Sequence, residues 1–272
     1  MLCDKKIMSS YTWNAEDYEK NSKAQQRWAR ELINKLSLTG SEKILDIGCG
    51  DGKVTAEIAS SVPDGQVVGV DNSISMIELA RERYPSKKYP NLSFEVMDAR
   101  ELSFHECFDV VFSNAALHWV KDHWPVVKGA YESLRTGGKI LFQMGGKGNA
   151  GEILSILDEI LSFPRWRPYF EGFEFPYGFL GIDEYEVLLK DAGFTINRVE
   201  LVPKDMEHDG KSGLKGWIRT TWLPYTERVP DELREEFIEE IATKYLEEVP
   251  VTSDGKAHVA MMRIEIEAER LA

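Results

Sequence analysis

The sequence is short of cysteine, of basic residues relative to acidic ones, and of long apolar runs. Its cysteines are Cys3, Cys49 and Cys107, an odd number without a C-x-x-C pair, so we expect reduced thiols in a cytoplasmic protein and no metal site. The 33 basic side chains face 46 acidic ones, a balance that repels nucleic acid. No apolar run approaches the roughly 20 residues that span a bilayer, and residues 1–10 lack the apolar core of a signal peptide. We therefore expect neither nucleic-acid nor membrane partners.

The first half of the sequence shows alternating strand and helix patterns. From Lys43 onward, short apolar runs alternate with helical patterns, which predicts an α/β domain with a parallel sheet. The expected strands are 44–47, 67–70, 92–96, 108–113 and 139–144. The expected helices of this half are 53–61, 73–84 with Ser73 as its cap, and one that begins near His123 and ends at Gly137-Gly138.

The second half of the sequence predicts two more strands of the same sheet, with a helical insertion between them. A helix over 183–191, closed by Gly193, precedes a strand over 194–202, and a last strand is expected over 259–268. The segment between them contains an amphipathic helix, 230–249, with apolar residues spaced by four, which indicates a helical lid. Its stripe is Leu233, Phe237, Ile241 and Tyr245.

A further helix is expected near the N-terminus, over 13–36, because Trp28, Leu32 and Leu36 follow the i, i+4, i+8 pattern. The expected organisation is an N-terminal helical cover 1–40, an α/β core 41–145, an aromatic cover segment 146–182, the rest of the core sheet in 183–202 and 256–272, and a helical lid 203–255.

The most informative motif is a glycine loop after the first strand, Gly48-Cys49-Gly50-Asp51-Gly52. Glycines let the backbone adopt positive φ and approach a ligand closely. A dinucleotide fingerprint, G-x-G-x-x-G, would need its third glycine at position 53, which is Lys53 here, and it lacks an acid at the place of Asp46. The loop therefore disfavours NAD.

Two more acids follow the second and third strands. Asp71 is placed to accept hydrogen bonds from vicinal ribose hydroxyls, and Asp98 to accept one from an adenine amino group. Each acid alone is equally compatible with a turn-forming role. With Asp46, however, the carboxyl ends of three successive strands carry acids beside a glycine loop, which is the edge where open α/β sheets bind ligands.

These residues resemble the class I S-adenosylmethionine-dependent methyltransferases. The resemblance covers 44–52, Val70-Asp71-Asn72-Ser73 with Met76, Asp98-Ala99, and 108–114. It implies a Rossmann-like, doubly wound sheet of order 3-2-1-4-5-7-6 whose last strand is antiparallel, and S-adenosylmethionine as cofactor.

The resemblance also implies residue roles. Gly48, Cys49 and Gly50 would lie against the methionine part, Asp71 would hold the ribose, Asn72 and Met76 would flank the adenine, Asp98 with Ala99 would meet its edge, and Asn114 and Ala115 would pass beneath the sulfonium. With Asp46, these are the expected cofactor-binding residues.

Two narrower resemblances concern the acceptor. The segments 18–25 and 116–120 are similar to juvenile hormone acid methyltransferases, in which a glutamine and a tryptophan at the places of Gln25 and Trp119 contact the substrate carboxylate. Trp13-Asn14-Ala15 with Tyr18, the segment 217–220, and Arg263 are similar to trans-aconitate methyltransferases. They imply Gln25 and Trp119 as catalytic residues. The implied substrate-binding residues are Tyr18, His118, Trp217 and Arg219.

The favoured reaction is methyl transfer to a carboxylate oxygen of a small molecule. A carboxylate is already ionised at neutral pH, so neither a base nor a metal is required. Methylation of another O, N or C acceptor, a non-catalytic cofactor-binding protein and a nicotinamide dehydrogenase are the alternatives. Arg167, Arg219 and Arg263 are candidates to neutralise an anionic acceptor, and the rings within 163–179 either line an apolar cavity or form lid core. A monomer or a homodimer is expected.

Overall fold

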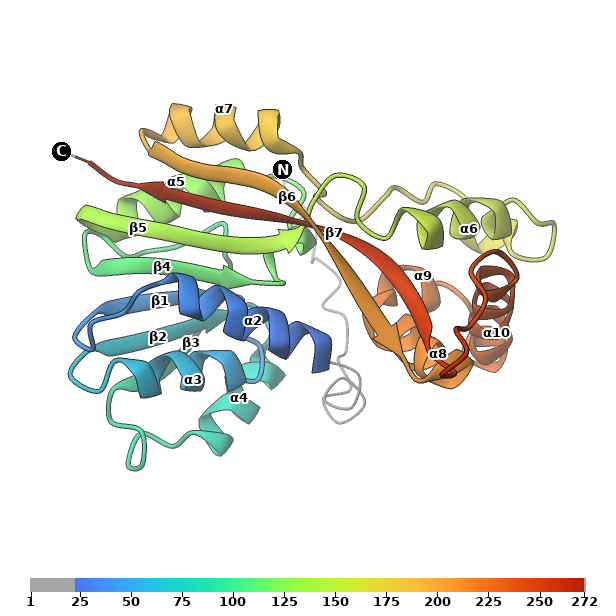
Figure 1. Ribbon diagram of the computed structural model, residues 1–272, viewed down its shortest axis with the longest axis horizontal. Coiled ribbons are helices and arrows are strands. Elements are labelled where there is room, and N and C mark those ends of the chain that lie inside the picture. The colour runs from blue at the N-terminus through green and yellow to red at the C-terminus, as the bar shows by residue number, and fades with distance from the viewer. Residues whose placement is uncertain (1–22, 272) are drawn as a thin grey trace, which may run out of the picture.

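The computed structural model describes residues 23–271, with residues 23–27 as backbone alone. Its strands form one sheet in the order β3-β2-β1-β4-β5-β7-β6, which confirms the expected order (Figure 1). β1 to β5 run parallel, and β7 runs antiparallel to both β5 and β6. The strands are β1 (Lys43–Ile47), β2 (Gln66–Asp71), β3 (Leu92–Val96), β4 (Phe108–Asn114), β5 (Leu134–Gly145), β6 (Thr195–His208) and β7 (Ala257–Glu269).

Helices cover both faces of the sheet because successive strand residues point to opposite sides. Ile44 and Val67 are buried in the core shared with α2 (Lys23–Lys35), α3 (Lys53–Ser61) and α4 (Ile74–Arg83). Leu45 and Val68 are buried on the opposite side, in the core shared with α5 (Trp124–Ser133) and α7 (Ile182–Ala192). The near-continuous apolar strands are therefore explained by burial on two sides.

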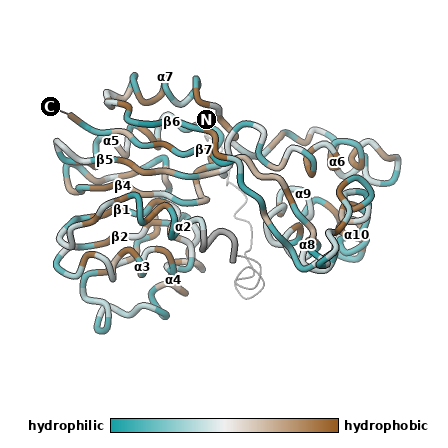
Figure 2. The backbone as a smooth tube through the Cα atoms, in the orientation of Figure 1, coloured by the Kyte–Doolittle hydropathy of each residue, from teal (hydrophilic) through white to brown (hydrophobic). Residues whose placement is uncertain are grey.

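The remaining helices form a second lobe, which we call the lid: α6 (Gly151–Leu161), η2 (Arg167–Phe170), α8 (Gly210–Thr221), α9 (Leu223–Thr226) and α10 (Asp231–Glu248). The lid has its own apolar core, in which the ring of Trp166 lies edge-on to that of Phe237, 5.0 Å between centroids. Hydrophilic and hydrophobic residues alternate along α10 (Figure 2), whose Phe237, Ile241 and Tyr245 are fully buried. No helix within residues 23–271 combines the length and apolar character needed to cross a membrane.

Two long strands join the lid to the sheet. β6 and β7 pair continuously from Thr195–Glu269 to His208–Ala257, apart from one irregularity near Ile196. Half of this ribbon belongs to the sheet, and the other half reaches the lid (Figure 1). The strand expected over 194–202 therefore extends to His208, beyond its predicted end.

A second predicted boundary is also wrong. α5 ends at Ser133, and Gly137-Gly138 lie inside β5 instead of closing the helix. Gly137 adopts a φ of +80°, and its N–H donates to the carbonyl of Arg270 at 2.7 Å. The glycines thus mark an irregular start of a strand, a role that the sequence does not distinguish from a helix end. The Ser73 cap of α4 and the left-handed Gly193 after α7 are confirmed.

Candidate active site

The glycine loop is held in place by the acid that ends β2. Asp71 accepts from the N–H of Gly50 at 3.0 Å through one carboxylate oxygen and from the N–H of Ser73 at 2.9 Å through the other. Gly48 has a φ of +75°, and a Cβ built on it would lie 2.1 Å from the Cβ of Ala116. A Cβ on Gly50 would meet nothing within 4 Å. The loop is therefore packed on one side and open on the other.

Asp46, in β1 just before the glycine loop, is hydrogen-bonded to the helix that follows the loop. Its carboxylate is 2% exposed and accepts a 2.7 Å hydrogen bond from the hydroxyl of Thr55 in α3. Burial raises the pKa of Asp46 to about 7, and the nearby charge of Asp71 acts in the same direction. The thiol of Cys49 faces the core, because a Cβ on Gly69 would lie 3.0 Å from its Sγ. Only the backbone of Cys49 can line the open side of the loop.

The third acid lies close to the second. The N–H of Met97 donates to the carbonyl of Asp71 at 3.0 Å, which brings the end of β3 to the end of β2. Asp98 is gripped by Arg100, with Nε 2.9 Å from Oδ1, and this bond lowers the pKa of Asp98. Asn72 is exposed at the rim, Met76 is buried, and Ala99 is half-buried.

The turn after β4 is strained. Ala115 has a φ of +57°, unusual for a residue with a side chain, and its N–H donates to the carbonyl of Gln143 at 2.7 Å. The side-chain oxygen of Asn114 is buried, and it has no hydrogen-bond partner among the residues described. The short helix η1 (Leu117–Trp119) follows directly. Such strain at a strand end is typical of functional sites.

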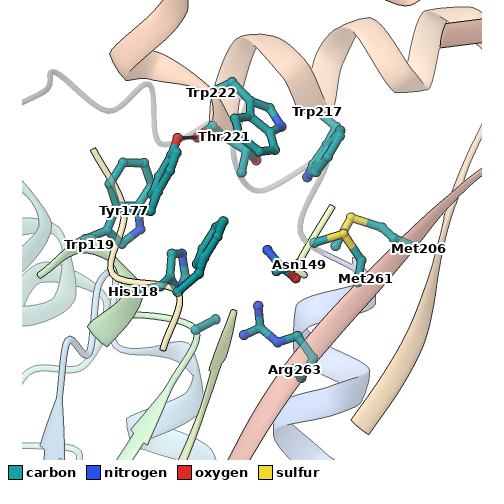
Figure 3. Close-up of a pocket in the computed structure, with 12 residues that line it drawn as sticks. His118, Trp119, Asn149, Tyr177, Met206, Trp217, Thr221, Trp222, Met261 and Arg263 are labelled. Carbon is teal, nitrogen blue, oxygen red and sulfur yellow. Dashed lines mark hydrogen bonds between the residues drawn. The ribbon is translucent and has the colours of Figure 1, made fainter. Parts of the chain in front are cut away.

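A cavity extends from Ala115 to the underside of the lid (Figure 3). Much of its described lining is aromatic and comes from the turn after β4, the segment before α7 and the lid. Tyr177 stacks on Phe179 with 5.2 Å between centroids, and Trp222 meets Tyr177 edge-on at 5.5 Å. The aromatic lining residues are Trp119, Tyr177, Phe179, Trp217 and Trp222, and the imidazole of His118 lines the same cavity.

Polar groups gather on the β7 side of the same cavity. Arg263 is 4% exposed, and Asn149, also 4% exposed, accepts from the N–H of Met262 at 3.2 Å. The indole N–H groups of Trp217 and Trp222 are buried and meet no acceptor in the described part of the chain. Figure 3 shows the Arg263 guanidinium and the Trp217 nitrogen both directed toward the space beside Asn149.

The electrostatics of this cavity are dominated by one charge. Burial, and then the charge of Arg263, lower the pKa of His118 well below its usual 6.5. His118 is therefore neutral at physiological pH. Arg263 is the one ionised side chain among the described residues that line the cavity.

The structure brings together some of the residues expected to bind substrate and separates others. His118, Trp119 and Trp217 line the cavity. Arg219 instead donates to Glu235 on α10 at 3.0 Å, because two positions along a helix face nearly opposite sides. Tyr18 lies outside the described residues, and Gln25 falls in α2 where only the backbone is described.

Sequence reasoning missed five lining residues: Asn149, Met206, Thr221, Trp222 and Met261. Met206 lies in β6 beyond the predicted end of that strand at residue 202, so an alternating pattern past 202 would have indicated it. Met261 lies inside the last predicted strand, but the sequence does not show which face of that strand meets the cavity. Asn149 lies in the glycine-rich loop after β5, where no sequence pattern predicts a residue that lines a cavity. The rings within 163–179 divide: Tyr177 and Phe179 line the cavity, while Trp166 is lid core.

Comparison with known proteins gives the family. Residues 44–138 match the model of the methyltransferase domain. An uncharacterized methyltransferase of Schizosaccharomyces pombe is 31% identical over 272 residues, which cover 95% of this chain and 98% of that protein. The chain belongs to the methyltransferase family. Trans-aconitate 2-methyltransferase of Variovorax paradoxus is 28% identical over 96% of this chain and 99% of its own length.

Solved structures agree on the fold. Phosphoethanolamine N-methyltransferase 2 of Haemonchus contortus, solved with S-adenosylhomocysteine, superposes on this methyltransferase with a TM-score of 0.61 at 20% identity, covering 94% of this chain and 57% of that one. The expected Rossmann-like methyltransferase fold is confirmed.

The methyl donor of this methyltransferase is S-adenosylmethionine, and the residues at the loop fit it. Asp46 is a buried carboxylate and Asp71 a half-buried one, neither has an ion pair to a described residue, and the cofactor carries a sulfonium and an ammonium. Asn114 offers a buried oxygen that awaits a donor. Gly50 leaves open space where a side chain would stand.

Proposed function

We propose that this methyltransferase esterifies a carboxylate oxygen of a small organic acid. The proposal is carried by one observation: Arg263 and the indole N–H groups of Trp217 and Trp222 are buried together in the cavity that starts at Ala115. A guanidinium and neutral N–H donors complement a carboxylate in charge and in hydrogen bonding. No carboxylate is found among the described lining residues.

The chain's own contribution to such a reaction is orientation and exclusion of water. Arg263 and Trp217 would hold the acceptor, and the aromatic wall of Tyr177, Phe179 and Trp222 would keep water out. When bound, S-adenosylmethionine supplies a methyl group: a carboxylate lone pair forms the O–C bond while the S–C electron pair stays on sulfur, so no proton is released. No general base is needed, which agrees with a neutral His118 of lowered pKa.

An amine acceptor suits this cavity less well. Protonated amines would lie beside the guanidinium of Arg263, and their deprotonation would require a base with a pKa near neutrality. The pKa of His118 is well below that range. Both points support an anionic acceptor.

Gln25 and Trp119 remain part of the proposal as residues that orient the carboxylate, with Tyr18 and His118 beside the acceptor. Trp119 lies at the cavity with its ring 5.0 Å from that of Tyr177. Asn72, Met76, Asp98 and Ala99 are proposed for the adenosine. A cytoplasmic enzyme acting as a monomer or homodimer completes the proposal.

The test is methyl-ester formation from S-adenosylmethionine and a panel of carboxylic acids, phenols and amines, read by mass spectrometry. We expect esters from acids and none of the amine products. Arg263→Met should lower kcat/KM for the acid by about 100-fold, the loss expected for a buried charged partner, while calorimetry shows unchanged affinity for S-adenosylhomocysteine. Arg167, a lid arginine that the sequence also offered as a partner for an anionic acceptor, is exposed and does not line the cavity, so Arg167→Met is the matched control. Amines as preferred acceptors would contradict the proposal.

A further inference from the structure

The lining of the cavity constrains the acceptor beyond its reactive group. Its described residues divide into a polar side, with Arg263 and Asn149, and an aromatic side, with Tyr177, Phe179 and Trp222. The polar side holds one ionised group. The aromatic side presents ring faces and edges that are already fixed against one another.

The number of charges sets the number of anionic groups that can enter. One guanidinium pairs with one carboxylate, and a second or third carboxylate in this cavity would lose its hydration without meeting another cation among the described lining residues. His118 does not supply that cation, because burial and Arg263 lower its pKa well below 6.5. The described lining therefore favours a single anionic group.

The position of the polar side links this one anion to the reaction. Ala115 is hydrogen-bonded to Gln143 of β5, and Arg263 pairs with Gly145, two residues further along the same strand. The backbone of Arg263 thus lies two strand spacings, about 10 Å, from the turn that carries Ala115. Its guanidinium points from β7 back into the cavity (Figure 3). The carboxylate that Arg263 holds can then be the one that faces the methyl donor.

The body of the acceptor must fill the aromatic side. Flat π-systems pack on ring faces and edges with an energy beyond that of simple apolar burial. Trp217 and Trp222 lie edge-to-face at 5.7 Å, and Trp222 also meets Tyr177 edge-on. Met206 and Met261 add polarisable sulfur at the β6–β7 side.

We infer that the acceptor is a monocarboxylic acid with a flat, unsaturated body, an aryl or conjugated alkenyl acid, whose carboxylate lies between Arg263 and Trp217 and whose body lies against Tyr177, Phe179 and Trp222. This inference rests on the proposed esterification. It departs from what the name of the trans-aconitate relatives would suggest, since aconitate carries three carboxylates.

The experiment compares four acceptors with the full-length protein: trans-cinnamate, trans-aconitate, 3-cyclohexylpropanoate, which has a saturated ring, and cinnamamide, which has no charge. Methyl transfer is followed by mass spectrometry of the product and by release of S-adenosylhomocysteine. We expect kcat/KM for cinnamate to exceed that for aconitate by about 100-fold and that for the cyclohexyl acid by about 10-fold, with no product from the amide.

Two variants locate the effect. Trp217→Phe keeps a ring and removes the donor, so kcat/KM for cinnamate should fall about 10-fold, as expected for one hydrogen bond to a charged group, with unchanged affinity for S-adenosylhomocysteine. Trp124→Phe, on an exposed tryptophan of α5, is the matched control. If Trp217→Phe is poorly folded, calorimetric binding of cinnamate and aconitate to the wild-type complex with S-adenosylhomocysteine gives the same comparison.

The outcomes separate the two claims. Efficient esterification of aconitate, or equal rates for the phenyl and cyclohexyl acids, would overturn the inference and leave carboxylate methylation standing. Failure to esterify any acid, although S-adenosylhomocysteine binds, would overturn both.

Discussion

Arg263 and His118 face the same cavity as a fixed cation and a neutral imidazole. Burial removes water from His118, and the guanidinium adds repulsion, so the pKa of His118 lies well below 6.5. Among the described lining residues, the pair therefore provides one charge, and that charge does not change between mildly acidic and alkaline pH.

A pH-independent rate follows from this pair. With a carboxylic acid as acceptor and S-adenosylmethionine saturating, so that the titration of Asp46 does not enter through cofactor binding, we expect kcat/KM for the acid to stay constant from about pH 6 to 9. The acid is ionised throughout this range and His118 stays neutral. A steady-state pH profile measures this. An inflection between pH 6 and 7 that disappears in His118→Gln would mean that His118 works as a base.

Asp46 predicts a pH-dependent stability. Its folded-state pKa is about 7 against a usual 3.8, so the folded protein holds this proton more tightly than the unfolded chain, and stability falls as pH rises from about 4 to 7. Asp46→Asn removes the charge and retains an oxygen for Thr55. The gain in unfolding free energy from this change should be about 2–3 kcal/mol larger at pH 8 than at pH 5, as measured by urea unfolding without cofactor. An equal gain at both pH values would show that Asp46 is not perturbed.

Asp71 should matter for the cofactor more than for folding. Its carboxylate accepts from Gly50 and Ser73 at the open side of the loop, so Asp71→Ala leaves two N–H groups without their acceptor. We expect affinity for S-adenosylhomocysteine to fall by about 10- to 100-fold, measured by calorimetry. The exposed Asp64 provides the control, Asp64→Ala. Unchanged affinity in Asp71→Ala would remove Asp71 from the cofactor site.

The two glycines of the loop should respond differently to alanine. Gly48→Ala places a Cβ 2.1 Å from Ala116, so the melting temperature should fall. Gly50→Ala meets open space and carries only the strain of a left-handed alanine, about 1–2 kcal/mol, but its methyl group would occupy the cofactor's side of the loop. We expect the larger loss of stability for Gly48→Ala and a loss of S-adenosylhomocysteine affinity for Gly50→Ala. The reverse pattern would contradict the assigned orientation of the loop.

Local patterns were enough to predict the sheet and the loop, because alternating burial and turn chemistry are written in consecutive residues. Ile44 and Leu45 point to opposite cores, as a doubly covered strand requires. The helix end predicted at Gly137-Gly138 is wrong because a glycine pair is compatible both with a helix end and with an irregular strand start.

The cavity was harder to predict, since it is assembled from distant segments. Trp217 and Arg219 both belong to the segment 217–220, which resembles trans-aconitate methyltransferases. Helical geometry nevertheless directs Trp217 to the cavity and Arg219 to Glu235. The approach of Arg263 to Asn149 depends on the register of β5 and β7, in which Gly145 faces Arg263. Pairing between residues so far apart in sequence leaves no trace in a single chain.

The β6–β7 ribbon connects the sheet, which carries the glycine loop, to the lid. It enters the lid at His208 and leaves it at Ala257, where Asp209 and Lys256 form an ion pair. Because residues 209–256 share the apolar core of the lid with α6 and η2, an exchange of the lid between relatives has to carry both segments, while the glycine loop with its adenosine site is inherited intact.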